Sequence, residues 1–281
     1  MKLNLVIPEQ VTTLAVEEHS PTVLTPEFLN YSGIVKSEWK LARQPICTSS
    51  GSSISYTNGI SIVADQERIM FVEAIDSKPF EEVAGPGIAR KYMQALPNVK
   101  YLAIGINFRG FAIFEDDDQK DAARKYINET LLSKGSWQEV GTSPLRATLN
   151  LTYTLERRVF NLSVNEAILR QADETTIASI MFSGNFSYDL ADKNEVEKLA
   201  ALHMAIDNWQ ADLNTYKEII NIKFLTSIAQ PKVTVPDVFA LSAKAWQRER
   251  LRGKGKMSYQ GSNLNLNKTN KPWLSLYKHC T

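Results

Sequence analysis

The stretch Ser53–Val63, SISYTNGISIV, decides the fold class of this sequence. Apolar and polar residues alternate on both sides of Asn58-Gly59, as they do in strands that bury one face. Asn and Gly tolerate the positive φ angles of a type I′ turn, so this pair predicts a hairpin with a two-residue turn. A third apolar run, Arg68–Ile75, follows after a short polar turn. The segment therefore predicts a three-stranded antiparallel meander.

The rest of the chain repeats this mixture of alternating and helical patterns. Two alternating runs predict a second hairpin, and a third run predicts the strand that completes a second meander. These three runs are 147–155, 159–169 and 176–190. Between the meanders, the segment 99–114 is interpreted as two strands that turn at Asn107 to Gly110.

Helices are expected at 88–96, near 122–131 and from 192 to about 222. The resulting order is βββα, ββα, βββα. This order predicts an α+β fold of antiparallel meander sheets with helices on one face. It also suggests a βββα duplication.

Three parts of the chain are expected. Residues 1–33 contain three prolines and few periodic features, and they are interpreted as an irregular N-terminal leader. Residues 34–230 form the α+β body, with two pseudo-repeats at 34–134 and 145–230. Residues 231–281 form an extended, basic and aromatic C-terminal arm.

Charge is distributed unevenly along the 281 residues, although the formal net charge is only +1. From Leu241 onward nine Lys and Arg stand against one Glu, a net charge of +8, whereas residues 1–240 carry a net charge of −7. With 43% hydrophobic residues the chain can build a core, which excludes disorder throughout. An acidic body with a basic tail indicates an anionic partner or self-association.

The arm combines cations with aromatic rings, and these side chains are the candidate binding residues. Such a composition fits three interpretations: cations and stacking rings for single-stranded RNA or DNA, docking on an acidic protein surface, or a solvated tail. The candidates are Lys244, Trp246, Arg248, Arg250, Arg252, Lys254, Lys256, Tyr259, Trp273 and Tyr277.

The long helix expected at 192–222 carries an apolar stripe at heptad spacing. One interpretation is that the stripe packs on the sheet of the same chain. The other is that the protruding end of the helix pairs with a second copy or a partner helix. The stripe consists of Leu199, Leu202, Ile206, Trp209, Leu213, Tyr216 and Ile220.

Motifs for catalysis or metal binding are weak. Glu115–Asp118 is a dense acidic cluster, but acidic residues at a helix start commonly cap backbone N–H groups, and the cluster lacks the spacing of a calcium loop. The histidines, His19, His203 and His279, do not form a metal-ligand pair. Gly85-Pro86-Gly87 lacks the remaining residues of a phosphate loop and is interpreted as a loop. No metal and no cofactor is therefore expected.

Compartment signals favour the cytoplasm. Cys47 and Cys280 are too few for a disulfide framework. The first residues lack the apolar run of a signal peptide, and no stretch reaches the roughly 20 apolar residues that span a bilayer. Six N-x-S/T triplets are then interpreted as chance matches to the glycosylation motif. They begin at Asn30, Asn128, Asn150, Asn161, Asn185 and Asn267.

The expected function is binding rather than catalysis. We expect an intracellular adaptor that joins a larger protein or ribonucleoprotein assembly through its basic arm. A protein partner or self-association is the first expectation, and binding of single-stranded RNA or DNA is the alternative. No membrane partner is expected and no small-molecule substrate is identified. A further alternative is an enzyme whose site is assembled from dispersed residues, with Glu115–Asp118 and His203 as contributors.

Overall fold

The computed structural model describes residues 3–76, 78–114, 121–156, 158–170, 176–190 and 193–226. The chain divides into two compact units, residues 1–231 and 232–281, and all described residues lie in the first. The arm expected at 231–281, with all ten of its candidate residues, therefore lies outside the described part. Among the described helices, none combines the length and the apolar composition needed to cross a bilayer.

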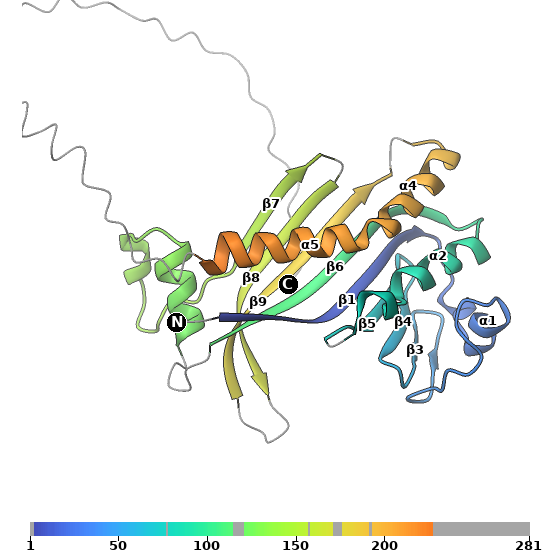
Figure 1. Cartoon of the computed structure of the whole chain (residues 1–281), viewed down its shortest axis with the longest axis horizontal. Coiled ribbons are helices and arrows are strands. Elements are labelled where there is room, and N and C mark those ends of the chain that lie inside the picture. The colour runs from blue at the N-terminus through green and yellow to red at the C-terminus, as the bar shows by residue number, and fades with distance from the viewer. Residues whose placement is uncertain are drawn as a thin grey trace, which may run out of the picture. The chain divides into compact units, whose positions relative to one another are not determined.

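The described chain forms one antiparallel sheet of nine strands, which confirms the α+β class (Figure 1). The strand order is β2-β3-β4-β5-β1-β6-β9-β8-β7. The strands are β1 (Leu3–Glu17), β2 (Ile46–Cys47), β3 (Ser52–Ser55), β4 (Ile60–Ala64), β5 (Arg68–Ala74), β6 (Lys100–Phe114), β7 (Leu149–Leu155), β8 (Arg158–Arg170) and β9 (Thr176–Asp189).

The strand order is the same on both sides of the central β1–β6 pair. Outward from β1 lie β5, β4 and β3, and outward from β6 lie β9, β8 and β7. Each half is thus a long strand, a three-stranded meander and then a helical segment. In the first half this segment is α2 (Gly85–Ala95), and in the second it is α4 (Glu195–Asp207) followed by α5 (Trp209–Glu218). These halves differ from the predicted repeats at 34–134 and 145–230, because each begins with its own central strand.

The prediction of an irregular leader at 1–33 is wrong. Strand β1 lies at the centre of the sheet and pairs with both β5 and β6. Its alternation is hidden because Pro8 lies at a register shift between Val6 and Glu9, and because the strand buries two polar residues, Gln10 and Thr12. Such a strand lacks the regular apolar pattern on which sequence interpretation depends.

The predicted turn at Asn107 to Gly110 is also wrong, because β6 runs without a break through these residues. Asn107 and Arg109 resemble turn residues in sequence, but here they alternate with the buried Phe108 and point to the opposite face of the sheet. Gly110 is required by close packing: a Cβ atom there would lie 2.6 Å from the Tyr216 hydroxyl oxygen. A polar pattern on one face of the strand was therefore mistaken for a loop.

The hairpin predicted around Asn58-Gly59 is confirmed, but the predicted two-residue type I′ turn is wrong. Asn58 does not have the positive φ that this turn requires, and the loop consists of residues 57–59, closed by a hydrogen bond from the Tyr56 amide to the Ile60 carbonyl at 2.8 Å. Strands β3 and β4 pair on either side of the loop, and Gly59 has a φ of +83°. The Asn58 side chain accepts a hydrogen bond from the Ile60 amide at 3.2 Å, which tightens the turn. The loop expected at Gly85-Pro86-Gly87 is instead the first turn of α2, where proline fits because the N–H that it lacks has no acceptor within the helix.

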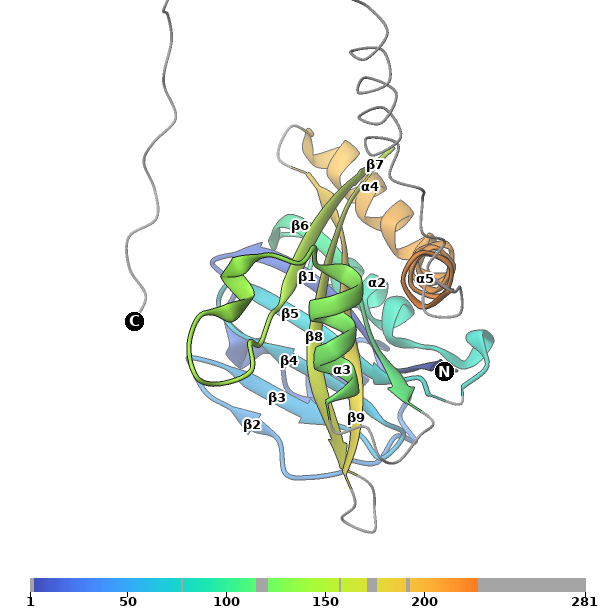
Figure 2. The same ribbon diagram turned by 90° about the vertical axis from the view of Figure 1, so that its left-hand side faces the viewer.

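Helices cover one face of the sheet, as expected. In Figure 2 α5 is seen end-on beside the strands, and in Figure 1 it crosses the second half of the sheet. Two short helices remain. In α1 (Pro26–Tyr31), the Phe28 ring packs on Tyr92 of α2. Helix α3 (Ala122–Lys125) continues into a π-helical turn, where the Tyr126 hydroxyl donates a hydrogen bond to the Phe224 carbonyl. Short helical turns lie at Pro21–Val23, Phe80–Glu82, Tyr126–Leu131, Ser136–Glu139 and Ile219–Leu225.

Candidate binding surfaces

The apolar stripe of the long helix lies mostly inside this chain's own core. The single helix expected at 192–222 is divided at Asn208 into α4 and α5. Of the stripe, Leu199 remains 42% exposed, and the other six residues are buried. Those six are Leu202, Ile206, Trp209, Leu213, Tyr216 and Ile220. A partner helix cannot contact these six side chains, because they are already packed in the core of this chain.

Tyr216 shows why α5 lies so close to the sheet. Its hydroxyl donates to the Phe182 carbonyl at 2.7 Å, and its ring lies over two strand glycines, Gly110 and Gly184. A Cβ atom at Gly184 would lie 2.7 Å from the Tyr216 ring and 2.9 Å from the Phe160 ring. Glycine on the sheet therefore creates the space that the aromatic side chain on the helix fills.

A buried ion pair fixes α5 to the ends of two strands. Asp212 of α5 has no exposed surface, and its carboxylate lies 2.8 Å from Arg158 Nε and accepts a 2.7 Å hydrogen bond from the Tyr188 hydroxyl. Arg158 also lies over the Phe186 ring, 5.2 Å from its centroid. Burial raises the pKa of Asp212 to about 6, although Tyr188 and Arg158 both act to lower it.

The Asp212 carboxyl lies apart from the neighbouring cavity. A cavity of about 280 Å³ lies beside the ion pair, with Arg158, Tyr188 and Lys193 among its lining residues. Asp212 does not line this cavity, and its oxygens already face Arg158 and Tyr188. A general base has to reach the proton that it removes, and in this structure Asp212 does not reach the cavity.

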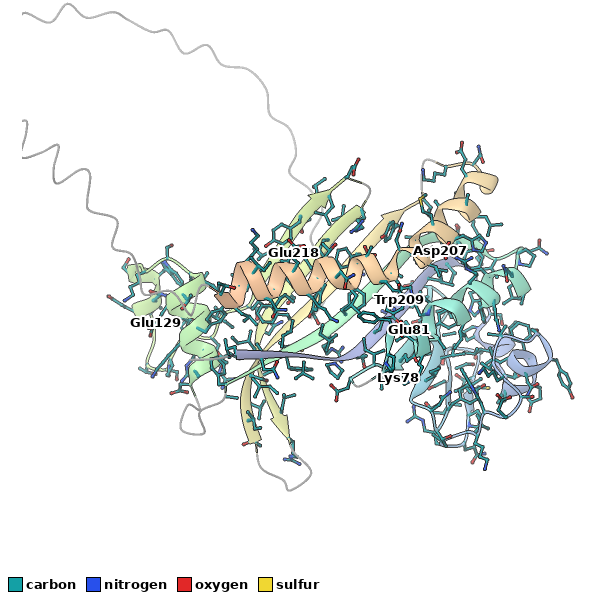
Figure 3. The ribbon with its side chains drawn as sticks, viewed as in Figure 1. Lys78, Glu81, Glu129, Asp207, Trp209 and Glu218 are labelled. Atoms are coloured by element: carbon teal, nitrogen blue, oxygen red, sulfur yellow. The ribbon has the colours of Figure 1, made fainter. Side chains whose placement is uncertain are left out.

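A larger cavity of about 550 Å³ lies between β1, the segment after β5 and α5. Its charged lining includes Lys78 and Glu81, which Figure 3 places near the Trp209 end of α5. Lys78 donates to Glu73 at 2.9 Å, and Lys217 lies 4.7 Å from the centroid of the Phe80 ring. Both lysines are thus held by neighbouring side chains. The cavity is lined by charges of both signs, and these charged groups do not point together at one position where a ligand would bind.

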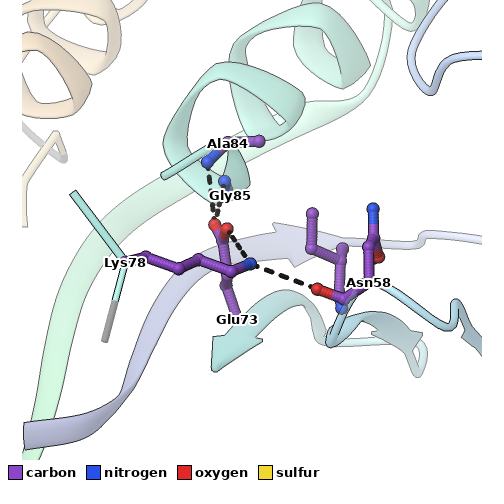
Figure 4. Close-up of polar contacts among 6 residues, drawn as sticks. Asn58, Glu73, Lys78, Ala84 and Gly85 are labelled. Carbon is purple, nitrogen blue, oxygen red and sulfur yellow. Dashed lines mark hydrogen bonds and ion pairs between the residues drawn. The ribbon is translucent and has the colours of Figure 1, made fainter. Parts of the chain in front are cut away.

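A second buried carboxylate, Glu73, lies under the first half of the sheet. Its side chain accepts hydrogen bonds from the Ala84 amide at 2.9 Å and the Gly85 amide at 2.6 Å, and Lys78 pairs with it (Figure 4). The carboxylate therefore caps the N-terminus of α2, where free amides and the helix dipole favour a negative charge. Its groups are fully used by this structural role.

The face of the sheet opposite the helices is different in character. We call it the open face and define it by three rows of residues that cross β1, β6, β9, β8 and β7 in register. The middle row is Val11, Asn107, Asn185, Asn161 and Thr152. The row on one side is Glu9, Arg109, Ser183, Ser163 and Asn150, and the row on the other is Thr13, Gly105, Ser187, Val159 and Thr154.

Amide and hydroxyl groups form a hydrogen-bonded network along the middle row. Asn107 Nδ2 donates to the Val11 carbonyl at 2.9 Å and to Thr13 Oγ1 at 3.1 Å. Asn185 Nδ2 donates to Asn107 Oδ1, and Thr152 Oγ1 donates to Asn161 Oδ1 at 2.9 Å. These bonds hold the short side chains in fixed positions, so the surface is preorganised for contact with another molecule.

The open face is electrically neutral. Among its fifteen defined residues the charged ones are Glu9 and Arg109, which form an ion pair at 3.3 Å. An ordinary solvent-facing sheet surface carries long charged side chains, and 22% of the whole chain is charged. Short uncharged polar residues are concentrated here.

The sequence does contain a signal for the open face, in the N-x-S/T triplets that were interpreted as chance matches. Three of them lie on adjacent strands: Asn150-x-Thr152 on β7, Asn161-x-Ser163 on β8 and Asn185-x-Ser187 on β9. The spacing of two places both polar residues on the open face and the residue between them on the helix-covered face. The repeated triplet thus marks strands with one polar hydrogen-bonding face.

The remaining candidate residues divide between described and undescribed parts of the chain. Glu115–Asp118 lies outside the described residues. His203 is half-buried on α4, and burial is the main cause that lowers its pKa. His19 lies 2.9 Å from the Tyr92 hydroxyl and is used in packing. Among the described residues, no group of three or more His, Cys, Asp or Glu side chains is arranged to bind a metal.

No family model matches the sequence, and no curated protein matches it with significant similarity.

Proposed function

We propose that this protein is a non-catalytic binding protein that joins a larger protein assembly, and that a protein partner docks on the open face. The observation that carries the proposal is the neutrality of that face within a body whose first 240 residues have a net charge of −7. Fixed amide and hydroxyl groups pair well with the uncharged polar groups of another protein.

A protein fits the open face better than a nucleic acid does. Phosphate groups require cations that are free to neutralise them. In the three rows of the open face the cation is Arg109, and Glu9 already pairs with it. The basic arm, with its net charge of +8, remains in this proposal a second contact for an acidic surface, on the partner or on a neighbouring copy.

The test is affinity recovery of the full-length protein and its partners from its native cells, with nuclease treatment and quantitative mass spectrometry. Asn161→Lys places a cation in the middle row, and we expect it to reduce recovery of the partner proteins at least tenfold, about 1.4 kcal/mol or more. Asn214→Lys makes the same change at an exposed position of α5 and should leave recovery unchanged.

Two outcomes would count against the proposal. Equal recovery by Asn161→Lys and the unmodified protein would remove the open face from partner binding. Loss of all partners after nuclease treatment would favour the nucleic-acid alternative instead. A deletion of residues 241–281, measured in parallel, gives the separate contribution of the arm.

A further inference from the structure

The two edges of the sheet are protected very differently. At one edge, β2 has two residues and follows directly after Pro45. At the other edge, β7 has seven residues, and no described strand pairs with its outer side. An unpaired edge offers its N–H and C=O groups to any other strand, and proteins usually protect it with charge, proline or short length. The sequence of β7, LNLTYTL, has neither a charged residue nor a proline.

The hairpin register identifies the groups that point outward from β7. Leu155 and Arg158 pair with each other and are separated by two residues in the sequence. Residues paired in this way exchange both backbone hydrogen bonds, and bonded and non-bonded positions then alternate along the strand. Leu155, Tyr153 and Leu151 therefore bond to β8. Asn150, Thr152 and Thr154 direct their N–H and C=O groups away from the sheet.

We propose that β7 pairs antiparallel with β7 of a second copy of this chain, about a two-fold axis at Thr152, so that two sheets join into one. In this register Thr152 lies opposite Thr152 of the second copy, and Asn150 lies opposite Thr154. Each pair exchanges two backbone hydrogen bonds, as narrow antiparallel pairs do. The outward-pointing groups of both strands are all satisfied.

The same register matches side chains on both faces of the joined sheet. On the helix-covered face, Leu151 lies opposite Tyr153 of the second copy, and Leu149 lies opposite Leu155. All four of these residues are partly exposed in the single chain, so pairing removes apolar surface from water. On the other face the polar Asn150, Thr152 and Thr154 meet one another. A shift by one residue would place apolar against polar positions.

Charges at the two ends of β7 favour the antiparallel direction. Arg146 precedes the strand and Glu156 follows it, and both side chains are exposed. Neither forms an ion pair with another described residue. Antiparallel pairing brings Arg146 of one copy close to Glu156 of the other at both ends, whereas a parallel arrangement would place like charges together.

A single pair of seven-residue strands is a small interface, so the association is expected to be weak and to depend on concentration. The inference is independent of the proposed function. Asn150, Thr152 and Thr154 also end the rows of the open face, but the pairing uses the outward backbone groups of β7, whereas partner docking uses side chains across the face.

Cysteine cross-linking tests the register directly, in the full-length chain with Cys47→Ser and Cys280→Ser. Thr152→Cys would face its own copy at a Cα separation of about 5.5 Å, which suits a disulfide. Thr154→Cys is the matched control on the same strand and face, and its copy would lie four residues away, about 13 Å. We expect mild oxidation to give a covalent dimer with Thr152→Cys but not with Thr154→Cys. Equal cross-linking of the two variants, or none in either, would overturn the proposal.

Sedimentation velocity over an about hundredfold range of protein concentration gives the second test. The mass of the unmodified protein should rise toward that of a dimer. Thr152→Pro removes an outward N–H without removing a hydrogen bond to β8, so it should remain a monomer with an unchanged circular dichroism spectrum. Asn161→Lys should associate as the unmodified protein does, even if it loses partner proteins. A monomer at every concentration, or a dimer of Thr152→Pro, would contradict the pairing.

Discussion

The two halves of the sheet solve the same problem, the burial of a carboxylate beneath a helix, in opposite ways. In the first half the carboxylate is Glu73 on a strand, and the helix supplies the donors, namely the Ala84 and Gly85 amides, together with Lys78. In the second half the carboxylate is Asp212 on the helix, and strand residues compensate it: Tyr188 donates a hydrogen bond and Arg158 forms an ion pair. Both have no exposed surface. The comparison shows that a buried carboxylate is compensated more completely by the backbone amides at a helix N-terminus than by side chains from neighbouring strands.

The largest effect is expected where compensation is most complete. Glu73→Ala leaves the first amides of α2 and Lys78 without their acceptor, and we expect a loss of about 3 to 5 kcal/mol in the free energy of unfolding. Denaturation with urea, followed by circular dichroism, measures it. Glu67→Ala, at an exposed position just before β5, should change stability by less than about 0.5 kcal/mol. A similar small change for both variants would show that the helix cap contributes little.

A pH-dependent effect of intermediate size is expected at Asp212. Its pKa is raised to about 6 in the folded chain, so the folded state holds this proton more tightly than the unfolded state does. The stability that this proton provides is present below about pH 4 and is lost as the pH rises to about 6, a change of roughly 3 kcal/mol. Asp212→Asn does not titrate.

The measurement for Asp212 is the difference in unfolding free energy between the unmodified protein and Asp212→Asn, taken from pH 4 to pH 7. Since the unmodified protein loses stability from this group as the pH rises, the difference should move in favour of the variant. A difference that stays constant over this range would mean that Arg158 and Tyr188 keep the carboxyl ionised throughout.

The smallest effects concern the glycines that allow each helix to approach the sheet. Gly184→Ala in the second half would bring a methyl group against the rigid rings of Tyr216 and Phe160, and we expect a cost of about 1 to 3 kcal/mol. Gly85→Ala in the first half meets Gln10 Oε1 at 3.0 Å and Glu73 Oε2 at 3.2 Å, which are longer contacts than those at Gly184. Its cost should be smaller. Thermal unfolding of both variants tests this order, and a larger loss for Gly85→Ala would reverse the comparison.

Sequence interpretation succeeded where one face of a strand is apolar and the residues between two strands strongly prefer a turn. Asn58-Gly59 is such a case, because Gly59 adopts a positive φ that glycine tolerates better than other residues. It failed in β1 and β6, where Gln10 is buried and Gly110 makes room for Tyr216. These choices depend on contacts with residues far away in the chain, which local periodicity does not report.

The candidate sites show the same division. Charge and aromatic content drew attention to the arm, because composition is visible in a sequence. The open face was missed because its residues, such as Asn107, Asn161 and Asn185, come from separate strands and become neighbours only when the sheet forms. The repeated spacing of Asn and Ser or Thr was present, but its meaning depended on the strand order.

The central position of β1 has a consequence for the synthesis of the chain. Glu9 pairs with Arg109, one hundred residues later, so the first strand leaves the ribosome well before its second neighbour exists. During that interval one side of a long strand has no partner, a state that invites aggregation and slows folding. Pro8 has no N–H to offer to another strand, so it limits incorrect pairing along this strand until β6 is made.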